Sequence, residues 1–138
     1  MILRSGIDLI EIDRLASLRP EIKARFLERV YTSQELAESG QDHAYLAGRF
    51  AAKEAVAKAL GCGIGPIHWK DIEVTRGSSG EPILTLHGAA ADLAREEGLT
   101  DWSISISHQH TQAVAMAVAV GQGSTTKPDA AAGVSNQL

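Results

Sequence analysis

The segment that most constrains the fold is an alanine-rich stretch, residues 42–60, which is predicted to be the longest helix of the chain. Asp42 can serve as its N-cap, and Gly61 or Gly63 can end it. Its small side chains are Ala51, Ala52, Ala55, Ala57 and Ala59. Because small side chains let other backbone come close, this helix is suited to close packing rather than to solvation. We therefore expect a small β-sheet to pack on it.

One strand and three short helices are predicted before the long helix. Residues 2–11 are apolar nearly throughout, which indicates a strand covered on both faces. Asp13 can cap the short helix that follows, and a helix over 20–30 begins with a proline. The capping-box pattern Thr32-Ser33-Gln34-Glu35 then predicts a third helix.

Two hairpins separated by a helix are predicted after the long helix. Residues 71–76 and 82–87 have the pattern of two strands joined by a glycine-rich turn. Residues 89–97 are predicted to be a helix, and the second hairpin follows over 102–108 and 112–120. This order of elements indicates an α+β fold.

Length and composition predict one domain, residues 1–121, followed by a disordered tail, residues 122–138. The chain has 138 residues, of which 44% are hydrophobic, and a chain of this size can bury a core of its own. The tail is glycine, serine, threonine, alanine and polar residues without periodicity. The net charge of -4 argues against a general nucleic-acid binder.

Cysteine content and hydropathy indicate a soluble, cytoplasmic protein. The single Cys62 excludes an internal disulfide and a cysteine metal cluster, and it suits a reducing compartment. The N-terminal residues lack the apolar stretch of a signal peptide. No run approaches the ~20 apolar residues that cross a membrane.

Two carboxylates occupy positions where apolar side chains would be expected. Asp8 lies between two apolar residues of the predicted strand, and Glu54 lies in the alanine-rich helix. A buried carboxylate is costly unless it is paired, hydrogen-bonded or bound to a metal. With Lys53 and Lys58 nearby, the two carboxylates suggest a cation and an anionic ligand held between strand and helix.

Each carboxylate also has a simpler interpretation. Glu54 and Lys58 are four residues apart, so they could form a surface ion pair worth ~0.3–0.5 kcal/mol. Asp8 could cap the turn that follows the strand. Neither residue alone therefore distinguishes a functional site from an ordinary structural role.

Serine alternates with isoleucine from Ser103 to Ser107, and His108 follows. The row of hydroxyls is either the solvated face of an edge strand or a polar wall for phosphates, with His108 donating to one of them. The chain has no Gly-x-Ser-x-Gly elbow, no Walker loop and no dinucleotide fingerprint. A serine hydrolase and the common nucleotide-binding folds are therefore not indicated.

Basic residues are concentrated between positions 14 and 29, where five of the 13 in the chain fall. Only Glu21 and Glu28 oppose them, so the stretch carries a local excess of positive charge. It is either a solvated face or a docking surface for an acidic partner. The basic residues are Arg14, Arg19, Lys23, Arg25 and Arg29, and the apolar side chains under or among them are Leu15, Leu18, Ile22 and Phe26.

Three segments together resemble a known family. They are Gly6-Ile7-Asp8-Leu9 with Ile12 and Arg14, Arg49-Phe50-Ala51-Ala52-Lys53-Glu54-Ala55 with Lys58, and Ser105-Ile106-Ser107-His108 followed by Ala113-Val114-Ala115. Their order and spacing over residues 1–120 are similar to those of the holo-acyl-carrier-protein synthase family. This family is the short, single-copy type of 4'-phosphopantetheinyl transferase.

The resemblance implies an enzyme that transfers 4'-phosphopantetheine from coenzyme A to a serine of apo acyl carrier protein. Such an enzyme releases 3',5'-ADP, requires Mg2+ and serves fatty acid biosynthesis. Asp8 and Glu54 would ligate Mg2+, and Lys58 would position or deprotonate the acceptor serine or bind phosphate. The residues implied to hold coenzyme A are Arg49, Lys53, Ser107 and His108.

The resemblance also implies a homotrimer with active sites between subunits. Longer members of the superfamily carry the fold twice, so in this single copy the second half of each site would come from a neighbour. Asp8 and Glu54 of one subunit would meet His108 of the next. The acidic carrier protein would dock on the basic stretch, and the contacts expected there are Arg14, Leu18, Ile22, Arg25 and Phe26.

Three other functions stay open. A coenzyme A or nucleotide-binding module without turnover would need the basic residues but not both carboxylates. An adaptor domain would have its acidic residues ion-paired. A transferase that acts mainly on carrier domains of secondary metabolism would share the whole site.

Overall fold

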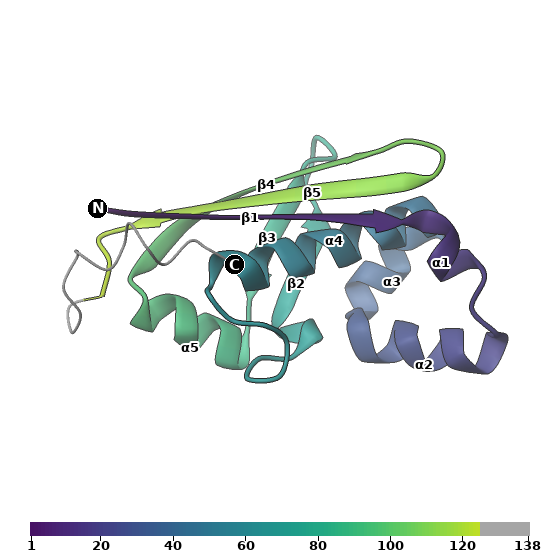
Figure 1. The fold of residues 1–138 in the computed structure, drawn as a ribbon, viewed down its shortest axis with the longest axis horizontal. Coiled ribbons are helices and arrows are strands. Elements are labelled where there is room, and N and C mark those ends of the chain that lie inside the picture. Colours follow the sequence, from purple (N-terminus) through teal and green to yellow (C-terminus); the bar gives the residue numbers. More distant parts are fainter. Residues whose placement is uncertain (125–138) are drawn as a thin grey trace.

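The computed structural model describes residues 1–124 and has the α+β fold predicted from the sequence (Figure 1). Most of the predicted disordered tail, 122–138, lies outside these residues. The elements in chain order are β1 (Ile2–Glu11), α1 (Ile12–Ala16), α2 (Pro20–Val30), α3 (Ser33–Ser39), α4 (His43–Ala59), the 3-10 turn η1 (Trp69–Asp71), β2 (Ile72–Arg76), β3 (Pro82–Leu86), α5 (Gly88–Glu96), β4 (Leu99–His108) and β5 (Gln112–Gly121).

Helix α4 packs directly on an antiparallel sheet of three strands in the order β1-β5-β4 (Figure 1). Two glycines allow the close approach. A Cβ on Gly6 would lie 1.9 Å from the carbonyl oxygen of Ala55, and one on Gly48 would lie 2.8 Å from Cγ2 of Ile106. The C-terminal half of the helix therefore touches β1, and its N-terminal half touches β4. Such close contacts are expected for an alanine-rich helix.

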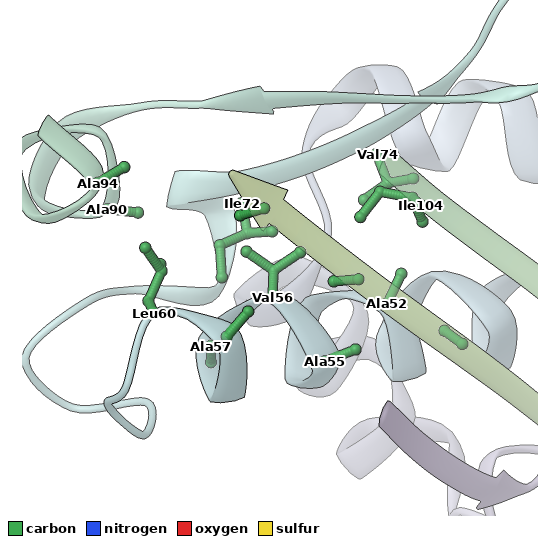
Figure 2. Close-up of a cluster of buried hydrophobic side chains, with 14 of the residues drawn as sticks. Ala52, Ala55, Val56, Ala57, Leu60, Ile72, Val74, Ala90, Ala94 and Ile104 are labelled. Atoms are coloured by element: carbon green, nitrogen blue, oxygen red, sulfur yellow. The ribbon is translucent and has the colours of Figure 1, made fainter. Parts of the chain in front are cut away.

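Helix α4 also contacts strand β2 of the two-stranded sheet β2-β3. Figure 2 shows this part of the core, where Val56 of α4 lies beside Ile72 of β2, and Val74 of β2 lies beside Ile104. Ala90 of α5 and Ile104 of β4 belong to the same buried cluster. The long helix thus contacts both sheets, and the two sheets also contact each other through β3 and β4.

Strand β1 corrects one prediction, because only one of its faces is covered. Its burial alternates along the strand, as in an antiparallel sheet with one solvated face. Leu3, Ile7 and Leu9 are 56%, 59% and 59% exposed, and Met116 on β5 is 45% exposed. The continuous apolar run therefore reflects a second apolar face that nothing within residues 1–124 covers.

Helix boundaries follow their local signals, with one exception. Thr32 and Glu35 form the predicted capping box of α3, and the Asp42 side chain accepts from the backbone N–H of Ala44 at the start of α4. Asp13 does not cap α1, contrary to prediction. It lies inside the first turn because the helix already begins at Ile12. Among residues 1–124, no helix has the length and apolar character needed to span a membrane.

Candidate active site

Asp8 and Lys58 meet where β1 crosses α4. Asp8 lies on the side of β1 that faces the helix, two residues beyond Gly6, where the two backbones touch. The Nζ of Lys58 donates to the carbonyl oxygen of Ile7 at 2.9 Å and lies 3.4 Å from Oδ1 of Asp8. The Asp8 and Lys58 side chains are 22% and 39% exposed, so the pair remains open to a ligand.

Glu54 lies one helical turn before Lys58, on the same face of α4. Burial raises the pKa of its carboxyl group, and the negative charge of Asp8 raises it further, while Lys58 opposes the shift. Two carboxylates that repel each other across a half-buried gap are stabilised by a cation placed between them. This is the feature of the site that favours a metal.

The donor set fits a magnesium ion. Within residues 1–124, no group of three or more His, Cys, Asp or Glu side chains could hold a metal. Mg2+ commonly takes one or two protein carboxylates and completes its shell with water and substrate phosphate oxygens. Asp8 and Glu54 would supply those two carboxylates, and a phosphorylated substrate would supply the rest.

Lys53 lies away from Asp8 and Glu54, and its predicted role in holding coenzyme A stays a prediction. Its side chain is fully buried, with Nζ 2.9 Å from Oε1 of Glu35. The same Nζ donates to the carbonyl oxygens of Trp69 and Ile72. An ammonium group has three donors, and these contacts use all of them. Successive helical residues are rotated by about 100°, so Lys53 faces the core although its neighbour Glu54 faces the site.

The Glu35–Lys53 pair holds three elements together. Besides Lys53, Glu35 accepts from the backbone N–H groups of Val74 on β2 and Thr32 at the start of α3. Burial lowers the pKa of Lys53, and the charge of Glu35 opposes that shift. From the sequence, Glu35 was identified only as part of a capping box, because a capping pattern does not reveal a tertiary partner.

Arg49 also lies away from the carboxylates. It is nine residues before Lys58, which places it on the far side of α4. Its guanidinium stacks over the Tyr45 ring at 4.2 Å, and the Tyr45 hydroxyl donates to Glu38. The Nε of Arg49 is buried and has no hydrogen-bond partner within residues 1–124.

Ser107 and His108 lie at the end of β4 and point to opposite faces of the sheet. Ser107 is exposed on the uncovered face. His108 borders a hollow of about 580 Å³ near the start of α4, which His43 and His110 also line. Neither Asp8 nor Glu54 lines this hollow. In one chain, the predicted site residues therefore divide into separate groups around α4.

Comparison with known proteins identifies the family. Residues 4–119 match the profile of the 4'-phosphopantetheinyl transferase superfamily. The holo-[acyl-carrier-protein] synthase of Carboxydothermus hydrogenoformans is 46% identical over 108 residues, which cover 76% of this chain and 87% of that protein. The synthase of Moorella thermoacetica is 50% identical over 111 residues, covering 77% and 84%. The chain belongs to the holo-acyl-carrier-protein synthase family.

A solved structure of this synthase family has the same fold. The Helicobacter pylori holo-[acyl-carrier-protein] synthase, in complex with coenzyme A, is 32% identical and superimposes with a TM-score of 0.77. The match covers 84% of this chain and 99% of that one. The resemblance seen in the three sequence segments is confirmed, and the chain is an enzyme of this family.

In this member of the synthase family, the basic stretch lies on α1 and α2. Arg14 and Arg25 are exposed, whereas Leu18 and Phe26 are half-buried. Ile22 is 39% exposed, so an apolar side chain lies among the charges. These residues have the exposure that a docking surface requires, and their role in docking stays a prediction.

Proposed function

We propose that the protein transfers 4'-phosphopantetheine from coenzyme A to a serine of apo acyl carrier protein, with Mg2+, in fatty acid biosynthesis. The observation that carries the proposal is the meeting of Asp8, Glu54 and Lys58 at the contact between β1 and α4. The relatives that support it are named holo-[acyl-carrier-protein] synthases. The cytoplasmic location expected from the sequence stays a prediction.

The chemistry is a phosphoryl transfer. The serine oxygen forms a bond to the phosphorus next to pantetheine, and the bond from that phosphorus to the oxygen of 3',5'-ADP breaks. The serine proton passes to water or to a base at the site. Bound Mg2+ supplies positive charge against the pyrophosphate. Asp8 and Glu54 offer the carboxylate oxygens. Lys58 donates one N–H to the carbonyl oxygen of Ile7 and one to Asp8. Its third N–H is left for a phosphate or serine oxygen.

We also propose that the active protein is a homotrimer with sites between subunits. Asp8 lies on β1, and the exposed Ile7 and Leu9 on either side of it face away from α4. A second chain that covers this apolar face would approach the Asp8 edge of the sheet. His108, Ser107 and Arg49 would then contact coenzyme A phosphates from the neighbouring subunit.

Mass spectrometry of an apo carrier protein tests the activity. Incubation with this protein, coenzyme A and Mg2+ should add one phosphopantetheine to the carrier. Asp8→Asn and Glu54→Gln should abolish the addition, and Asp92→Asn, an exposed acid on α5, should not. Coenzyme A binding without any mass gain would instead favour the binding module without turnover.

A transferase for carrier domains of secondary metabolism remains a second candidate, because it would use the same site. Competition between the two classes of apo carrier at limiting enzyme separates it from the proposed function. Faster modification of the fatty acid carrier supports the proposal, and the reverse order overturns its pathway part alone.

A further inference from the structure

We infer that the docking surface for the acidic carrier extends beyond α2 to the turn η1, where Lys70 and His68 form its second wall. The inference rests on the proposed function, since that function supplies the acidic partner. It adds residues from a segment far from the basic stretch in the sequence. Folding brings the two segments together.

The two walls enclose a shallow hollow of about 600 Å³. Helix α2 contributes Arg25, Glu28 and Arg29, and the η1 segment contributes His68, Lys70 and Asp71. Both arginines, His68 and Lys70 are exposed. Asp71 is less available to a partner, because its carboxylate accepts from the backbone N–H of His68 at 3.0 Å. The hollow thus offers more positive than negative groups to its occupant.

The position of η1 relative to α2 is held by aromatic packing. The ring of Phe26 on α2 lies 5.4 Å from that of Phe50 on α4, and Phe50 lies 4.9 Å from Trp69 in η1, centroid to centroid. The buried Lys53 donates to the carbonyl oxygen of Trp69. Lys70 follows Trp69 directly, so it is presented on a well-supported turn rather than on a loose loop.

Charge complementarity identifies the occupant as an acidic protein surface. The stretch over 14–29 has an excess of positive charge, and Lys70 adds one more cation at its edge. An acidic helix lying in the hollow would have cations on both sides, which sets its orientation as well as its rate of encounter. Attraction between exposed charges acts over about 8–10 Å at moderate salt, so η1 and α2 would act on the same segment of the partner.

Lys70→Glu tests the inference, with Arg95→Glu on α5 as the matched control. Arg95 is exposed and lies outside the hollow. Steady-state kinetics should show the KM for apo carrier rising about three- to tenfold in Lys70→Glu, because an attraction is replaced by a repulsion. The KM for coenzyme A and the melting temperature should stay unchanged. The increase should shrink at high salt, and Arg95→Glu should leave both KM values unchanged.

A carrier KM that Lys70→Glu raises no more than Arg95→Glu would overturn the inference. A rise in the KM for coenzyme A alone would also overturn it, because the hollow would then bind a nucleotide phosphate. If the wild-type protein transfers nothing, the proposed function fails instead. Calorimetric titration with an apo carrier whose acceptor serine is alanine then tests the docking surface. The dissociation constant should rise in Lys70→Glu and not in Arg95→Glu.

Discussion

Lys53 and Glu35 form a fully buried ion pair, with Nζ 2.9 Å from Oε1. The pair joins α4 to α3 and, through Val74 and Trp69, to β2 and η1. Its place in the core explains why a lysine next to Glu54 in the sequence takes no part in the Asp8–Glu54 site. Removing one member would leave an uncompensated charge in the core.

Lys53→Met should lower the free energy of unfolding by about 3–5 kcal/mol, because Glu35 would then be a buried charge without a partner. The double variant Lys53→Met with Glu35→Gln should recover part of that loss. Urea unfolding monitored by circular dichroism measures both. Lys70→Met, at an exposed lysine, is the control. If Lys53→Met left stability unchanged and greatly raised the KM for coenzyme A, Lys53 would instead bind phosphate.

Mg2+ should raise the melting temperature of the wild-type protein without any substrate. A ligand at a hundred times its dissociation constant stabilises the folded state by about 2.7 kcal/mol. Asp8→Asn and Glu54→Gln should lose this increase, since each removes a proposed ligand, and Glu96→Gln should keep it. Equal increases in all four proteins would contradict a metal site at Asp8 and Glu54.

The stability of the metal-free protein should depend on pH through Glu54. The pKa of Glu54 is raised above its ordinary value of 4.5, so the folded state holds this proton more tightly than the unfolded state does. As pH rises from below 4.5 to neutral, ionisation therefore disfavours folding. Glu54→Gln should become more stable than wild type over this range. Urea titrations at each pH measure the difference, which excess Mg2+ should remove.

Gly6→Ala should destabilise the protein by about 1–3 kcal/mol or more, because the new Cβ would lie 1.9 Å from the Ala55 carbonyl oxygen. The displaced β1 should also weaken transfer by moving Asp8 away from α4. Gly63→Ala is the control, since a Cβ there meets nothing within 4 Å. Thermal melts and transfer assays should separate the two variants, and similar behaviour would argue against a tight contact.

Subunits should complement one another if the sites lie between them. Mixed Asp8→Ala and His108→Ala chains, refolded together, should recover part of the transfer activity that each lacks alone. Ile7→Glu should prevent assembly, because it places a charge on the exposed apolar face of β1. Light scattering reports the assembly state. An active wild-type monomer would refute the trimer, as would mixtures that stay inactive.

Local sequence signals determined most of the elements. Thr32 and Glu35 marked the start of α3, and Asp42 marked that of α4. The first hairpin followed from its glycine-rich turn and the second from its period-two pattern. The meeting of Asp8 with the Glu54 face of α4 was also predictable. Two carboxylates in apolar settings indicated a shared cation, and the family motifs pointed the same way.

Tertiary packing alone decided the rest. Periodicity shows which residues share a face but not what that face meets, so Lys53 could not be separated from the site until Glu35 was found beside it. The apolar run of β1 did not reveal that one of its faces would lack cover in a single chain. Lys70 joined the basic stretch only because Phe26, Phe50 and Trp69 pack together. Contacts between segments distant in the sequence depend on the whole core, and no local pattern encodes them.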